Sequence, residues 1–200
     1  MSVKYKSEIG MEYTLQKPEG EEDPGLFFFS SHDVGEVVDE LPSGYEIYED
    51  PENEPFLVPE GKNPVPEDEI AALKSELEKI DHLNQYENFW HVESFDNSIR
   101  VYLLDQTPEA VADVISSLPE EGERILKEIS EGDVTYTAYM KFGRGEEEKD
   151  VYYVDRRMFT GLQKRDEDKW FFVASEKNIT EAASKYLPHL EQDSFFELGI

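Results

Sequence analysis

An alternating stretch near the middle of the chain places the strongest constraint on its fold. Strict alternation of apolar and polar residues is typical of a strand with one buried face. Residues 90–105, WHVESFDNSIRVYLLD, alternate on both sides of Asp96-Asn97, a pair that tolerates the left-handed conformation of a tight turn. Setting Phe95 opposite Ser98 therefore predicts an antiparallel hairpin.

This register sorts the side chains of the hairpin onto two different faces. On one face it pairs Glu93 with Arg100 and His91 with Tyr102, so that an ion pair bridges the two strands. A slip by one residue would exchange the two faces, so the register follows from the apolar pattern. We expect the other face to be buried, because it gathers four apolar side chains: Trp90, Val92, Val101 and Leu103.

Strand-like and helix-like segments alternate along the rest of the chain. Short apolar or alternating runs predict strands at residues 11–17, 26–30, 45–48, 56–58, 134–142, 151–159 and 170–174. Helical spacing of apolar residues predicts helices at residues 33–41, 66–80, 107–118, 125–129 and 178–190. Hairpins alternating with helices favour an α+β fold, a mostly antiparallel sheet built from hairpins with helices packed on one face. They argue against a doubly wound parallel sheet.

The length of 200 residues suits one domain or two small ones. We expect residues 1–200 to form a single α+β domain that ends in a C-terminal tail at residues 191–200. If the chain is divided, the interrupted helical region 119–132 is the expected place.

Composition excludes several classes of protein. The chain has no cysteine, which excludes disulfides, thiol catalysis and thiolate zinc sites. No apolar run approaches the roughly 20 residues of a membrane-spanning helix, and the start does not resemble a signal peptide. A cytoplasmic protein is therefore expected. The net charge of −28 would repel nucleic acid and anionic membranes, so neither is an expected partner.

The acidic charge is distributed unevenly. No lysine or arginine occurs between Lys17 and Lys62, a stretch that holds 14 acids. Residues 141–169, in contrast, carry eight bases and eight acids. An acidic face formed largely by residues 19–60 therefore predicts a basic or cationic partner, although a charged run also occurs as a plain solvated surface.

One acidic loop is a candidate binding site, because Asp50, Glu52 and Glu54 lie together in EDPENEP. A calcium loop of the EF-hand type needs Gly at its sixth position and Glu at its twelfth. Counting from Asp50, these positions hold Pro55 and Gly61, so that motif is absent. A looser cation site and a solvated turn remain as interpretations, and we expect no metal.

Two further candidates lie in the predicted sheet. His91 and Glu93 share a strand face, where they could act as an acid–base pair or simply bond to their cross-strand partners. Arg156 and Arg157 belong to a basic stretch that could bind an anionic ligand or pair with neighbouring acids.

The absence of any catalytic signature favours a non-enzymatic interaction module with an acidic face for a basic partner. The alternative is a small hydrolase or small-ligand-binding protein with a carboxylate/Arg site assembled in three dimensions. Neither interpretation requires a cofactor.

Overall fold

The computed structural model divides the chain into two compact units, Met1–Pro64 and Val65–Ile200, named the first and the second unit below. It describes residues 2–61, 65–84, 88–95, 97–105, 124, 136–145, 151–159 and 170–199. The boundary falls at the proline-rich link. Residues 119–132 lie outside the described residues except for Arg124, and a single domain over residues 1–200 stays a prediction.

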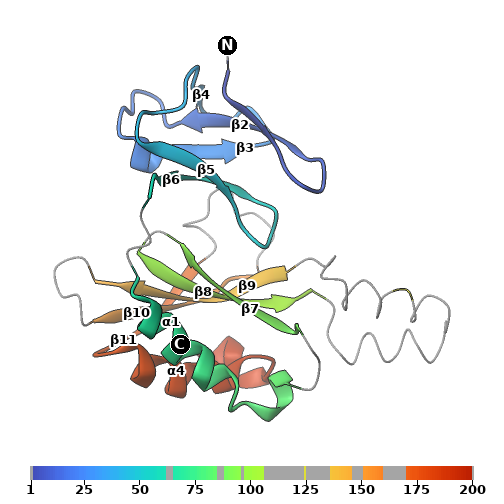
Figure 1. Ribbon diagram of the computed structural model, residues 1–200, viewed down its shortest axis with the longest axis vertical. Coiled ribbons are helices and arrows are strands. Elements are labelled where there is room, and N and C mark those ends of the chain that lie inside the picture. The colour runs from blue at the N-terminus through green and yellow to red at the C-terminus, as the bar shows by residue number, and fades with distance from the viewer. Residues whose placement is uncertain are drawn as a thin grey trace. The chain divides into compact units, whose positions relative to one another are not determined.

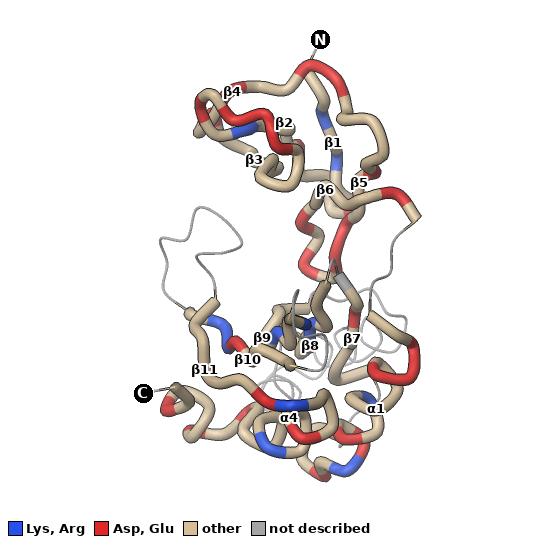
Figure 2. Tube along the Cα trace, turned by 90° about the vertical axis from the view of Figure 1, so that its left-hand side faces the viewer, with Lys and Arg blue, Asp and Glu red and all other residues tan. Residues whose placement is uncertain are grey.

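The first unit consists of short antiparallel strands. Its four-stranded sheet is centred on β2 (Glu12–Lys17), which pairs with β1 (Lys4–Lys6), β3 (Phe28–Ser30) and β4 (Glu36–Val37). A separate hairpin joins β5 (Tyr45–Glu49) to β6 (Pro55–Pro59), and a 3₁₀ turn covers Pro24–Leu26. Figure 1 shows both groups of strands. The apolar pattern did not predict β1, which is labelled in Figure 2.

The prediction of a helix at residues 33–41 is wrong. Instead, this segment is extended: Glu36–Val37 forms β4, and Val38 N donates to Leu15 O at 3.0 Å. The helix does not form, because the side chain of Gln16 binds the backbone at residues 32–35 and holds it along the sheet. The helical spacing of the valines was thus overridden by a tertiary contact.

The second unit is built on a five-stranded antiparallel sheet in the order β11–β10–β9–β8–β7 (Figure 1). Its strands are β7 (Trp90–Phe95), β8 (Ser98–Leu104), β9 (Tyr136–Arg144), β10 (Tyr152–Arg157) and β11 (Trp170–Glu176). The α-helices are α1 (Glu67–Leu77) and α4 (Ile179–Tyr186), and 3₁₀ turns cover Asp81–Asn84, Leu187–His189 and Asp193–Glu197.

These elements confirm a mostly antiparallel α+β architecture. In Figure 1, α1 and α4 lie on the same side of the five-stranded sheet, and they also pack against each other. The helices predicted at residues 107–118 and 125–129 lie outside the described residues. That all helices share one face therefore stays a prediction. No helix in the described ranges is both long and apolar enough to cross a membrane.

The helices predicted at residues 66–80 and 178–190 are both present, but α1 ends at Leu77 and α4 ends at Tyr186. Pro66 precedes the first turn of α1, and Leu73 and Leu77 are fully buried. Asn178 caps α4, since its Oδ1 accepts the Glu181 amide at 2.8 Å. The following segment belongs to the same core, because Phe195 is only 1% exposed.

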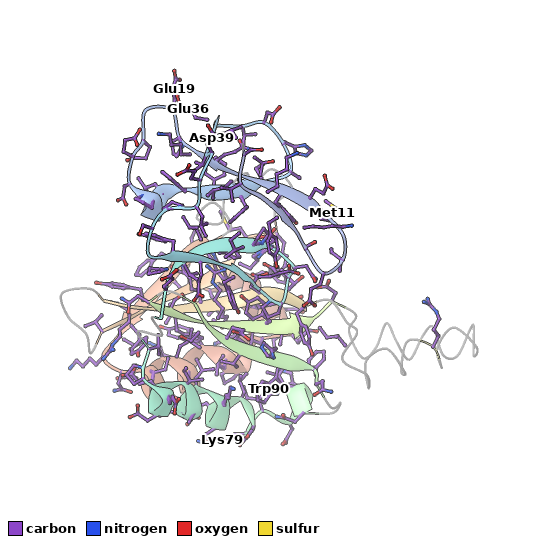
Figure 3. All side chains as sticks on the ribbon, turned by 45° about the horizontal axis from the view of Figure 1, so that its top comes forward. Met11, Glu19, Glu36, Asp39, Lys79 and Trp90 are labelled. Atoms are coloured by element: carbon purple, nitrogen blue, oxygen red, sulfur yellow. The ribbon has the colours of Figure 1, made fainter. Side chains whose placement is uncertain are left out.

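The central hairpin adopts the predicted register, with Phe95 opposite Ser98 and Glu93 opposite Arg100. Val101 and Leu103 are fully buried, as expected. Trp90 is half-buried, and its Nε1 donates to Asn84 Oδ1 at 3.1 Å on the helix side of the sheet (Figure 3). On the opposite face of the hairpin, Tyr102 is also fully buried.

Candidate functional site

The first unit concentrates acidic charge at its surface. Residues 1–64 contain four lysines and 16 acids, and Figure 2 shows the acids spread over its loops and strand ends. Lys17 lies among them: its Nζ is 2.5 Å from Glu22 Oε1 and 3.8 Å from Glu36 Oε2. The hydrogen bond to Glu22 raises the pKa of Lys17, so this lysine stays charged and neutralises part of its surroundings.

Exposed apolar side chains accompany these acids. Val34 is 51% exposed and Val37 is 46% exposed, both on the segment that the sequence predicts as a helix. The backbone of Glu36 pairs with Lys17, and Gly20 N lies 3.5 Å from Glu36 Oε2. We call the resulting region the acidic–apolar surface and define it by Glu19, Glu22, Val34, Glu36 and Val37. Figure 3 shows Glu19, Glu36 and Asp39 at the same end of the first unit.

A buried glutamine shapes this surface. The Gln16 side chain is fully buried, and its Oε1 accepts the amides of Val34 at 2.9 Å and Gly35 at 2.7 Å. Its Nε2 donates to His32 O at 2.6 Å. Gly35 is required at this point, because a Cβ there would lie 2.5 Å from Lys17 O. The chain is therefore held close to β2 at Gly35, which leaves the neighbouring valine side chains in solvent.

The acidic loop predicted as a binding candidate is organised by its own first residue. Asp50 is only 4% exposed, and its Oδ1 accepts the amides of Glu52 at 2.9 Å and Glu54 at 3.0 Å. Asn53 takes a positive φ of 61° to complete the turn. The Asp50 carboxylate thus stabilises the loop. Glu52 and Glu54 are half-buried.

The acids of this loop also act on a neighbouring tyrosine. Burial raises the pKa of Tyr13, and the negative charges of Glu54, Glu49 and Asp50 raise it further. Among the residues that the structure describes, no three acidic or histidine side chains are grouped so that they could hold a metal ion.

In the second unit, four charged residues form a row across the sheet. Glu93, Arg100, Lys141 and Asp155 are successive register partners on β7, β8, β9 and β10. Lys141 Nζ is 3.2 Å from Asp155 Oδ2. The Trp170 ring lies beside both cations, with centroid distances of 5.6 Å to Arg100 and 5.1 Å to Lys141. The sequence did not reveal this row, because the order of strands beyond the hairpin was unknown.

The centre of the charged row is closed to solvent, since Arg100 is only 3% exposed. The solvent-exposed end of the row is formed by His91 and Glu93, which the sequence analysis named as a candidate site. His91 Nε2 is 2.8 Å from Glu93 Oε1, and their side chains are 43% and 31% exposed. His91 also lies 5.8 Å from the Tyr136 ring, measured between ring centroids. Both side chains of this pair are partly exposed to solvent.

The two arginine candidates do not act together. Arg156 and Arg157 are consecutive residues of β10, where they are opposite Phe171 and Trp170. Because successive side chains of a strand alternate, the two arginines point to opposite faces of the sheet. Arg156 is occupied by the C-terminal segment, because its Nε donates to Leu198 O at 2.9 Å. Arg157 shares a face with His91 but lies three strands away, about 14 Å at the usual strand spacing.

Comparison with known proteins adds no assignment: the chain matches no family description, no curated protein and no solved structure. Sequence reasoning found the acidic character of the first unit but missed Gln16 and the exposed valines. The only signal for them was the glycine within the predicted helix, which is unfavourable inside a helix and frequent where backbones approach closely.

Proposed function

We propose that the protein is a non-enzymatic interaction module whose first unit binds a basic partner through the acidic–apolar surface. One observation carries this proposal: half-exposed Val34 and Val37 lie among acids whose nearby lysine is already paired. Exposed apolar side chains grouped with uncompensated charge are typical of surfaces that bind a partner.

The chemistry of the surface defines its partner. A lysine- or arginine-rich protein segment that also carries apolar side chains would match both features. The net charge of −28 accelerates encounter with such a segment and disfavours nucleic acid and anionic membranes. Binding should therefore weaken as salt is added, while the apolar contribution persists.

A small-ligand-binding protein is the second candidate, and the charged row of the second unit supports it. The row contains the carboxylates and the arginine that such a site needs, and His91 and Glu93 provide an accessible end. The buried position of Arg100 weighs against it, because a ligand would have to reach a side chain with 3% exposure. The interaction module is therefore the better-supported function.

Binding of a labelled basic peptide tests the proposal. The probe is a 12-residue peptide of six lysines alternating with apolar and serine residues, measured by fluorescence anisotropy at low and moderate salt. The variant Glu19→Gln/Glu22→Gln/Glu36→Gln should weaken binding about tenfold, since three exposed charges are removed. Val34→Ser/Val37→Ser should weaken binding without changing its salt dependence.

The matched control removes the same number of exposed acids from the second unit: Glu67→Gln/Glu78→Gln/Asp81→Asn. We expect this control to retain most of the affinity. An equal loss in both triple variants would show that the peptide responds only to total charge and would contradict the proposed surface. Small carboxylate and phosphate probes that bind the native protein and not Lys141→Gln would favour the second candidate.

A further inference from the structure

The strand β11 forms one edge of the five-stranded sheet and has an unusual composition for an edge. Among the described residues it pairs only with β10, and its sequence is WFFVASE. Edge strands usually carry charged residues or prolines that prevent pairing with other chains. Six of these seven residues are uncharged, and Phe172 is 55% exposed. Within the described part of the chain, protection of this edge is therefore expected from the residues close to β11.

Residues 193–199 lie next to β11 and are the candidate for protecting its edge. Its anchor is Phe195, which is 1% exposed and contacts the Tyr139 ring at 5.7 Å between centroids. His189 Nδ1 lies 2.8 Å from Ser194 Oγ and joins the start of the segment to the turn after α4. These contacts fix the direction in which the chain continues.

Arg156 then clamps the end of the segment to the sheet. Its Nε donates to Leu198 O at 2.9 Å, and its Nη2 donates to Phe196 O at 3.3 Å. The same guanidinium lies 4.8 Å from the centroid of the Phe171 ring, on β11 itself. One side chain from β10 thus connects the segment to both β10 and β11.

Gly199 brings the backbone directly against the edge strand. A Cβ at this position would lie 2.9 Å from Phe172 O and 2.7 Å from Phe171 Cε1. Gly199 also has a φ of +79°, a conformation that favours glycine. Only glycine combines this conformation with this approach, so the contact with β11 depends on the residue.

We propose that residues 193–199 are a strap that covers the edge of β11 and prevents it from pairing with β11 of a second copy of the chain. Antiparallel pairing of two identical edge strands is self-complementary about a two-fold axis. The exposed Phe172 and Tyr153 rings, 6.4 Å apart between centroids, would then be covered by their counterparts. Release of the strap therefore converts a monomer into a dimer.

Two glycine substitutions test the strap with a matched control. Gly199→Ala adds backbone strain and the collision with β11, whereas Gly44→Ala adds the same strain at φ +81° with no atom within 4 Å. We expect Gly199→Ala to raise the hydrogen-exchange rates of the β11 amides about tenfold and to produce a dimer in sedimentation velocity. Gly44→Ala should leave both properties unchanged.

Arg156→Gln is a second variant. It removes the guanidinium that binds residues 193–199 and leaves the sequence of that segment unchanged. It should have the same two effects, since the hydrogen bonds to Leu198 O and Phe196 O are weakened or lost. Unchanged exchange in both Gly199→Ala and Arg156→Gln would overturn the strap. Faster exchange in a protein that stays monomeric up to millimolar concentration would overturn the pairing with a second copy.

Discussion

The two units of this protein are stabilised in different ways. The second unit has a continuous apolar core that includes 21 buried residues. Among the described residues of the first unit, Leu15 alone is a fully buried large aliphatic side chain, and three polar side chains are buried instead: Ser7, Gln16 and Asp50.

Each of the three polar side chains holds a loop. Ser7 Oγ accepts the Met11 amide at 3.1 Å, Gln16 binds residues 32–35, and Asp50 binds the amides of its own loop. The first unit therefore depends on hydrogen bonds between a few buried side chains and the backbone, whereas the second depends on apolar burial. This arrangement leaves apolar side chains of the first unit available at the surface.

The largest effect is expected from the apolar core of the second unit. Leu73→Ala should lower the free energy of unfolding by about 2–5 kcal/mol, because it removes a fully buried side chain and leaves a cavity. Denaturant unfolding can be followed by tryptophan fluorescence, since Trp90 and Trp170 both lie in this unit. Leu26→Ala, at a side chain that is 47% exposed, is the control and should change stability by less than about 0.5 kcal/mol. A loss below about 1 kcal/mol for Leu73→Ala would contradict the assigned core.

The next effect tests whether the first unit depends on buried polar contacts. Gln16→Ala leaves two amides and one carbonyl without their side-chain partner, so it should destabilise the first unit by about 2 kcal/mol. The measurement is hydrogen exchange at Val34 and Gly35. Exposed Gln192→Ala is the control and should have no effect. Unchanged exchange in Gln16→Ala would mean that packing alone holds this segment.

Added salt should stabilise the two units to different extents, because their charges differ. Sodium chloride from 0.01 to 1 M shortens the screening length from about 30 to 3 Å, which relieves repulsion between exposed acids. The free energy of unfolding of the first unit should rise by on the order of 1 kcal/mol, because this unit has 16 acids and only four lysines. Exchange rates measured unit by unit check this, and the Glu19→Gln/Glu22→Gln/Glu36→Gln variant should show a weaker salt response. An equal rise in the free energy of unfolding of both units would contradict the expected electrostatic difference between them.

The smallest effect concerns one ion pair of the second unit. The hydrogen bond from Lys185, and then that from Tyr186, holds the pKa of Glu176 below its usual value. Since the folded pKa is lowered, the stabilisation is present above the unfolded pKa of about 4.3 and is lost as pH falls through the folded value. Glu176→Gln should therefore lower the melting temperature by about 2 °C at pH 7 and by nothing in strong acid.

The exposed variant Glu78→Gln serves as the control for this titration. At pH 7 its melting temperature should stay close to that of the native protein, because this side chain is exposed. A Glu176→Gln difference that persists in strong acid would show that packing, and not charge, is responsible.

Several features follow from the sequence by itself because they depend on neighbouring residues. The alternation over residues 90–105 determined the register of the hairpin, since any slip would expose its apolar face. The spacing of Leu73 and Leu77 in α1, and of Ala182 and Tyr186 in α4, determined which helix faces are buried.

The tertiary structure decided the features that join distant parts of the chain. Gln16 turns a helical pattern into an extended edge 18 residues away, and Arg156 holds a carbonyl 42 residues away. The charged row exists only because β8 and β9 become neighbours. Periodicity reports which face of an element is buried, but it carries no information on the partner of that face. The roles of Gln16, Arg100 and Arg156 were therefore set by the packing of strands that are remote in sequence.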